Sequence, residues 1–188
     1  MNFNAHSDLI GKHAVLSASK YHWINYDLEK FRTVYQNQVA AQLGTELHDL
    51  ASKLIKLRVP LPKKKQTLNL FVNDAIGYRM VSEQPLFYSK NWFGTADAIC
   101  CHDGLLRIHD LKTGAIDAKI DQLEIYAALY CLEYGEKPEK LDMELRIYQN
   151  NQALAYNPPP EEIRRIMNLG IQFDKEIEKM RQQGEIVE

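Results

Sequence analysis

The dipeptide Asp103-Gly104 lies between two strand-like stretches and predicts a β-hairpin. The flanking stretches are residues 92–101 and 105–111. A two-residue loop at this dipeptide sets the register so that Asp97 faces Asp110. Carboxylates that face each other across a ladder lie roughly 4.5–5.5 Å apart at Cβ and repel. The hairpin therefore predicts that one of the two is protonated or that a cation lies between them.

Oxygen ligands that converge on one point suit a hard cation such as Mg²⁺ or Mn²⁺. The same register places Lys112 opposite Thr95, where its ammonium group would suit a phosphate or an attacking water. A three-residue loop would instead move Asp97 out of the pair. In the alternative interpretation, Asp97 and Asp110 are solvated surface residues at strand ends.

Four short motifs follow one another along the chain. They are Gly44-Thr-Glu-Leu-His48, Gly94-Thr-Ala-Asp97, Asp110-Leu-Lys-Thr-Gly114 and Gln122-Leu-Glu-Ile-Tyr126. In this order they resemble the RecB-like branch of the PD-(D/E)XK nuclease superfamily, which includes phage exonucleases and CRISPR adaptation nucleases. The resemblance implies an α/β fold with a restriction-endonuclease-like core, in which helices flank a central mixed β-sheet. It also implies a single nuclease domain over residues 1–188.

The resemblance also implies roles for particular residues. The implied catalytic residues are Asp97, Asp110, Lys112, Gln122 and Tyr126; the implied metal ligands are His48, Asp97, Asp110 and the backbone carbonyl of Leu111; the implied substrate contacts are Gln122, Tyr126 and Thr113. Helical position alone favours a packed core residue for His48. Gln122 and Tyr126 share one helix face at i, i+4, which also fits a bridge between helix and sheet.

The implied activity is hydrolysis of DNA phosphodiester bonds with one or two Mg²⁺ or Mn²⁺ ions. An exonuclease that acts in phage-type DNA recombination or processing is expected. The expected partners are single- or double-stranded DNA ends, a second copy of the chain and a recombination partner protein. Two other classes stay open: a non-catalytic nucleic-acid-binding or assembly protein that retains the nuclease fold, and a metal phosphohydrolase that acts on nucleotides.

Cysteine content and net charge narrow the function further. Cys100, Cys101 and Cys131 are too few for a four-cysteine site, so no iron–sulfur cluster is expected. The net charge of −2 argues against tight non-specific wrapping of nucleic acid but leaves room for a local basic groove. The run Lys63-Lys64-Lys65 fits either a solvated turn or a phosphate contact.

The chain contains no apolar run of the roughly 18–20 residues that a membrane span needs. Residues 1–7 lack the pattern of a signal peptide. No membrane partner is therefore expected. The expected location is the cytoplasm of a bacterial or phage-infected cell.

The periodicity of apolar residues predicts three segments. The first contains the N-terminal helices over residues 1–58, with Asp27 as an N-cap and Gly44 as a kink or break. The second is the sheet core with its motif helix over residues 77–157. The resemblance implies a Glu near the metal at about the position of Glu83, but a surface residue is expected there. The third is a helix over residues 160–183 that packs on the sheet or mediates self-association.

Overall fold

The computed structural model describes residues 4–12, 14–114 and 119–184. The chain divides into two compact units, Met1–Leu43 and Gly44–Glu188, and the boundary falls within helix α1 (Leu28–Leu57). Every predicted site residue belongs to the second unit. The single domain over residues 1–188 stays a prediction.

The first unit contains two short 3-10 helices and the beginning of α1. The 3-10 helices are η1 (Ser7–Leu9) and η2 (Ala18–Asn25). Asp27 caps α1 as predicted, because its Oδ1 accepts a 2.7 Å hydrogen bond from the Lys30 N–H. None of the described residues of this unit is buried, so they form no hydrophobic core of their own.

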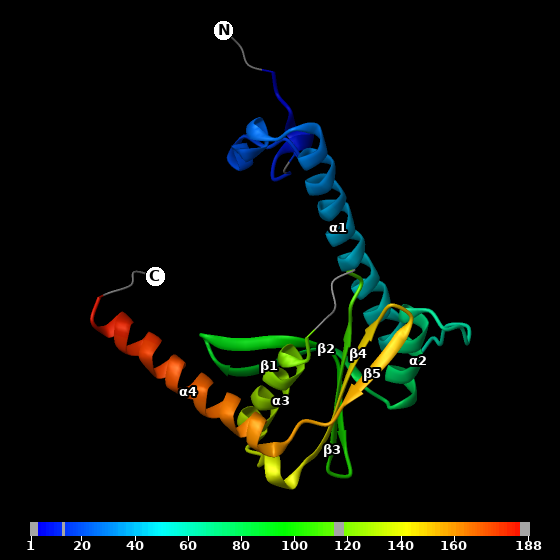
Figure 1. Ribbon diagram of the computed structural model, residues 1–188, viewed down its shortest axis with the longest axis vertical. Coiled ribbons are helices and arrows are strands. Elements are labelled where there is room, and N and C mark those ends of the chain that lie inside the picture. Colours follow the sequence, from blue (N-terminus) through cyan, green and yellow to red (C-terminus); the bar gives the residue numbers. More distant parts are fainter. Residues whose placement is uncertain (1–3, 13, 115–118, 185–188) are drawn as a thin grey trace. The chain divides into compact units, whose positions relative to one another are not determined.

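The second unit is built on a five-stranded sheet in the order β1-β2-β3-β4-β5 (Figure 1). The strands are β1 (Val81–Ser89), β2 (Trp92–His102), β3 (Leu105–Leu111), β4 (Asp142–Gln149) and β5 (Gln152–Tyr156). β3 and β4 are parallel, and the other neighbours are antiparallel. The expected α/β fold with a mixed sheet is therefore confirmed.

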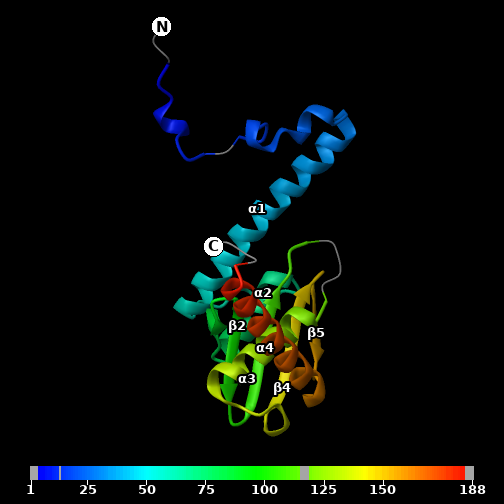
Figure 2. The same ribbon diagram turned by 90° about the vertical axis from the view of Figure 1, so that its left-hand side faces the viewer.

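Helices cover both faces of the sheet (Figures 1 and 2). α3 (Asp121–Tyr134) and α4 (Pro160–Gln182) pack on one face through a core that includes Leu123, Leu145 and Ile163. Residues 44–57 of α1 and helix α2 (Thr67–Gly77) pack on the other face through Ile55 and Phe71. A 3-10 helix, η3 (Pro138–Lys140), precedes β4. Among the described residues, no helix combines the length and apolar character that crossing a membrane requires.

Turn residues fix the connections of the sheet. Asp103 and Gly104 have φ angles of 52° and 78°, as a two-residue type I′ hairpin loop requires. Asn150 and Asn151, with φ angles of 50° and 60°, make the same kind of loop between β4 and β5. The predicted register of the first hairpin is confirmed from the loop to the pair Ala98–His109, where the regular pairing ends, so Asp97 and Asp110 lie just beyond it.

Two details of the prediction were wrong. Gly44 does not interrupt α1, which is a continuous helix from Leu28 to Leu57. Thr95 and Lys112 do not pair, because β3 ends at Leu111 and the Lys112 N–H donates instead to the Tyr148 carbonyl in the parallel ladder, at 2.9 Å.

A buried histidine lies at the centre of the sheet, next to Asp110. The hydroxyl of Tyr148 donates to Asp74 at 2.7 Å and lies 3.2 Å from His109 Nδ1, so a neutral His109 donates from Nδ1. Its Nε2 has no hydrogen-bond partner among the described residues. Burial, together with the positive charges of Arg146 and Arg107, lowers the pKa of His109 to about 3.

This histidine is expected to make the protein acid-sensitive. In the unfolded chain His109 takes up a proton below about pH 6.5, whereas in the folded chain it does so only near pH 3. Folding stability should therefore fall by about 2–3 kcal/mol between pH 6.5 and 4.5 through this group. Urea unfolding at both pH values should show that the free energy of unfolding of His109→Gln falls by about 2–3 kcal/mol less than that of the wild type. An equal loss in the two proteins would contradict the assignment.

Candidate metal centre

Three carboxylates stand at one level on three neighbouring strands. The pairs Ser82–Ala98 and Gln84–Ala96 bracket Glu83 and Asp97, so these two residues occupy facing positions on β1 and β2. Asp110 on β3 is one step beyond the Ala98–His109 pair, on the other side of Asp97. The sheet thus concentrates three acidic residues in one place, which is unfavourable without a compensating charge.

His48 of α1 completes a group with two of these carboxylates. One ligand atom from each of His48, Glu83 and Asp97 lies within 4.8 Å of the others. His48 Nδ1 is 3.3 Å from Asp97 Oδ2, and this hydrogen bond raises the pKa of His48 against the opposing effect of burial. Burial raises the pKa of Glu83, and the Asp97 carboxylate raises it further.

Asp110 is the buried member of the acidic row. It is not part of the 4.8 Å group, but burial and then the charge of Asp97 raise its pKa, which the Lys112 ammonium opposes. Lys112 Nζ donates to Asp110 Oδ1 at 3.0 Å. The buried Oδ2 lies 3.0 Å from the same Nζ but receives no directed hydrogen bond. Asp110 therefore retains an acceptor atom with unused capacity for a cation.

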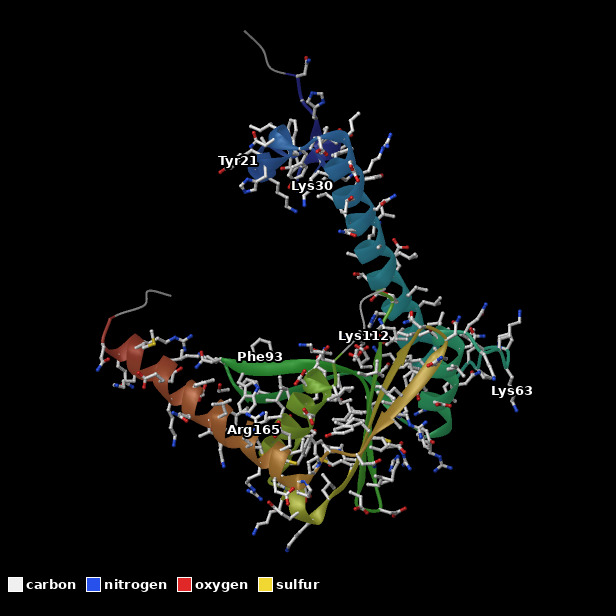
Figure 3. The ribbon with its side chains drawn as sticks, viewed as in Figure 1. Tyr21, Lys30, Lys63, Phe93, Lys112 and Arg165 are labelled. Atoms are coloured by element: carbon white, nitrogen blue, oxygen red, sulfur yellow. The ribbon has the colours of Figure 1, made fainter. Side chains whose placement is uncertain are left out.

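A chain of polar side chains leads from Asp110 to α3. Lys112 Nζ also donates to Gln122 Oε1 at 2.7 Å, and Gln122 Nε2 donates to the Tyr126 hydroxyl at 3.0 Å. The i, i+4 spacing of Gln122 and Tyr126 places both on the face of α3 that meets Lys112. Figure 3 shows Lys112 where β3 ends. The fold thus brings together Asp110, Lys112, Gln122 and Tyr126, as the motifs predicted.

The backbone departs from regular strand geometry at the acidic row. Residues two apart on a regular strand share a face. Ala98 nevertheless packs in the core under α1 and α2, whereas Ala96 packs in the core under α3. Glu83, which faces Asp97, has a φ of 52°, a left-handed conformation that is unfavourable for a residue with a side chain. Strained backbone of this kind is concentrated at functional sites.

Two motif glycines each lie against a predicted site residue. A Cβ on Gly44 would lie 2.8 Å from Thr113 Oγ1, and a Cβ on Gly94 would lie 2.8 Å from the ring of Tyr126. The first contact joins α1 to the turn after Lys112, and the second places β2 directly under α3. The glycines therefore allow the elements that carry the site to approach closely.

Gly94→Ala is expected to lower the stability of the protein by about 1–3 kcal/mol, since the new methyl group would displace the Tyr126 ring. The same change in a Tyr126→Ala background should leave the free energy of unfolding almost unchanged. Chemical denaturation of the four proteins gives the coupling between the positions. A cost of Gly94→Ala that is the same in both backgrounds would exclude contact with Tyr126 as its cause.

Leu111 and Thr113 occupy positions beside this site. The Leu111 N–H donates to Asp97 Oδ2 at 2.8 Å, which orients that carboxylate; a metal bond from the Leu111 carbonyl stays a prediction. Both residues line a pocket of about 330 Å³ together with Lys112, and Thr67, Asn150 and Asn151 line its other side. A substrate group next to Lys112 could occupy this pocket.

The donor set fits a hard divalent cation. Carboxylate oxygens together with one imidazole nitrogen suit Mn²⁺, whereas oxygen ligands alone suit Mg²⁺. Asp110 Oδ2 is buried and receives no directed hydrogen bond, and the nearby Asp97 carboxylate repels it. A cation bound here would stabilise both carboxylates. His48, Asp97, Asp110 and Glu83 could supply the ligands.

Glu83 is the site residue that the sequence did not identify. Its side chain is exposed, as predicted for a surface residue, but it lies in the metal-ligand group with His48 and Asp97. Its position opposite Asp97 depends on the register of β1 against β2, which the local sequence does not show.

A scan against protein-family models and searches of curated proteins and of solved structures found no match to this chain. The resemblance to nucleases therefore stays a prediction from the four motifs.

Proposed function

We propose that the protein hydrolyses phosphodiester bonds in DNA with one or two Mg²⁺ or Mn²⁺ ions held by Asp97, Asp110 and His48, with Glu83 as an additional ligand. The observation that carries the proposal is the row of three carboxylates beside one lysine. The close approach of several negative charges destabilises a sheet unless a cation is present. A divalent ion, when bound, would acidify its water and offset the charge of the phosphate.

The side chains around Asp110 suit the remaining parts of the reaction. Lys112, at 3.0 Å from Asp110, would orient or help to deprotonate the attacking water and would offset negative charge in the transition state. Gln122 holds Lys112 and the Tyr126 hydroxyl in place and leaves the phenolic proton free for a phosphate oxygen or a water. Thr113, in the adjoining pocket, would contact the substrate.

Exonuclease action is the proposed mode, and it follows from the resemblance to the RecB-like branch. A role in phage-type recombination and a partner protein stay predictions on the same basis. A second copy of the chain and the absence of an iron–sulfur cluster, expected from the three cysteines, also stay predictions.

The test is a digestion series with linear DNA in Mg²⁺, Mn²⁺, Ca²⁺ and EDTA. Degradation in Mg²⁺ or Mn²⁺ that stops in EDTA and slows when both ends are blocked supports a metal-dependent exonuclease. Binding without cleavage under all conditions would favour the non-catalytic alternative. Hydrolysis of nucleotide analogues with long DNA left intact would favour a nucleotide phosphohydrolase.

A further inference from the structure

The segment from the end of α1 to α2 is strongly basic although the whole chain carries a net charge of −2. Between residues 50 and 82 the only acidic residue is Asp74, and its carboxylate is neutralised by Arg146 at 3.2 Å. The same stretch contains seven basic residues, which are Lys53, Lys56, Arg58, Lys63, Lys64, Lys65 and Arg79. This concentration of charge at one place on the second unit requires an explanation.

The residues directly before the lysine run are held in place by two side chains of α2. The Asn73 side chain makes two hydrogen bonds to Leu61, accepting from its N–H at 2.8 Å and donating to its carbonyl at 3.0 Å. Asn69, which is buried, donates to the Pro62 carbonyl at 2.8 Å. Binding a ligand here would therefore cost little loop ordering.

The lysine side chains themselves are unpaired. Within the described residues, no carboxylate forms an ion pair with Lys63, Lys64 or Lys65. They line a hollow of about 510 Å³ whose other walls include Leu61, Leu70 and Ile76. Figure 3 shows Lys63 at the outer edge of this loop. Three ammonium groups on an ordered rim are thus available to an anionic partner.

The loop continues into the pocket beside Lys112. Thr67 and Leu68, the first residues of α2, line that 330 Å³ pocket together with Lys112. Lys65 is two residues before Thr67, so its Cα lies at most about 7 Å from that of Thr67. An elongated ligand could therefore extend from the candidate metal centre, past α2, to the lysine loop.

We propose that Lys63, Lys64 and Lys65 form an anchor for the phosphate backbone of a nucleic-acid strand whose scissile phosphate lies at the metal centre. The proposal rests on the proposed function for the identity of the strand. Lysines are point charges that bind phosphates without reading bases, so the anchor is sequence-independent. A ligand that contacts both the pocket beside Lys112 and the lysine loop must extend past Thr67 and Leu68, which a strand of several nucleotides fits better than a single nucleotide.

The test compares the triple variant K63A/K64A/K65A with a control triple variant, K137A/K140A/K175A. The control removes the same charge from exposed positions, two of which lie at or beside η3, at the end of β3 and β4 opposite to the candidate metal centre. Binding of labelled single-stranded and duplex DNA is measured with Ca²⁺ between 50 and 200 mM NaCl. The loop variant should bind at least about tenfold more weakly at 100 mM NaCl, with a salt slope smaller by about 2–3.

A second measurement separates the anchor from the chemistry. Hydrolysis of the p-nitrophenyl ester of thymidine 5′-monophosphate, which has one phosphodiester, should be unchanged in the loop variant. Equal DNA binding by the two triple variants would overturn the anchor. So would a loss of activity of the loop variant on the small ester that equals its loss on DNA. Displacement of DNA by polyglutamate as effectively as by unlabelled DNA would instead indicate a site for acidic protein. If the wild type cleaves neither substrate, the proposed function fails, whereas the binding comparison still tests the loop.

Discussion

Asp110→Asn is expected to lower metal-dependent hydrolysis by about 10³-fold or more. The change removes one proposed charged ligand while keeping the shape of a buried side chain. A bound metal ion contributes several kcal/mol to the transition state, and each ~1.4 kcal/mol corresponds to a factor of ten in rate. Initial rates on linear DNA in Mg²⁺, together with Mn²⁺ affinity from calorimetry, measure the effect. Both the rate and the affinity should fall.

The same variant should be no less stable than the wild type in EDTA. Burial and Asp97 raise the pKa of Asp110, so its favourable contribution in the metal-free protein is present at low pH and is lost as pH rises through that raised pKa. Asparagine is neutral throughout. The stability of the variant relative to the wild type should therefore increase as pH rises, and thermal unfolding at several pH values measures this increase.

Asp142→Asn is the matched control for this experiment. Asp142 is exposed and lies at the start of β4, opposite Leu105 and so at the far end of β3 from Asp110. It should keep full activity and metal affinity. Cleavage by Asp110→Asn at the rate of this control would remove Asp110 from the site.

Lys112→Gln is expected to lower the hydrolysis rate by about 10²–10³-fold while Mn²⁺ affinity is retained or increased. The amine is the only basic side chain within 4.0 Å of the Asp110 carboxylate among the described residues. Its loss removes charge stabilisation from the transition state but leaves every carboxylate ligand in place. The combination of a low rate with intact metal binding distinguishes Lys112 from a ligand.

Lys112→Gln should also destabilise the metal-free protein by about 1–3 kcal/mol, because it leaves a buried carboxylate without its cation. Adding Asp110→Asn should restore that stability, since the uncompensated charge is then gone. Lys140→Gln, an exposed lysine of η3, serves as the control. Loss of Mn²⁺ affinity in Lys112→Gln, or no rescue by the second change, would contradict the assigned role.

Much of the second unit could be predicted because local signals agree with the fold. Asp103-Gly104 demands a two-residue loop, and that loop alone determines which residues of β2 and β3 face each other. Gly135 follows the last turn of α3 and ends the helix with a φ of 70°, a conformation that glycine adopts without strain. The i, i+4 spacing of Gln122 and Tyr126 likewise needs only local helix geometry.

The position of Glu83 could not be predicted because it depends on a β-bulge. Ser89 pairs with Trp92 around the loop that joins β1 to β2, and regular pairing from there would place Glu83 opposite Ala98. The register shifts between Phe87 and Ser89, which moves Glu83 opposite Asp97. A one-residue shift of this kind moves every side chain beyond it to the other face of the sheet. No residue type in the strand indicates such a shift.

Gly44 was misjudged for a related reason. Glycine weakens an isolated helix, so a break was expected at this position. In the fold, Gly44 is buried against Thr113, and this tertiary packing explains why the position is glycine without any interruption of α1. Long-range contacts of this type are invisible in the local pattern.

We infer that the acidic row of Glu83, Asp97 and Asp110 holds a divalent cation. The most direct measurement is an anomalous difference map from crystals grown with Mn²⁺. We expect a peak within about 2.0–2.6 Å of carboxylate oxygens of both Asp97 and Asp110. A map without a peak at Asp97, from protein that degrades DNA in the same Mn²⁺ concentration, would contradict it.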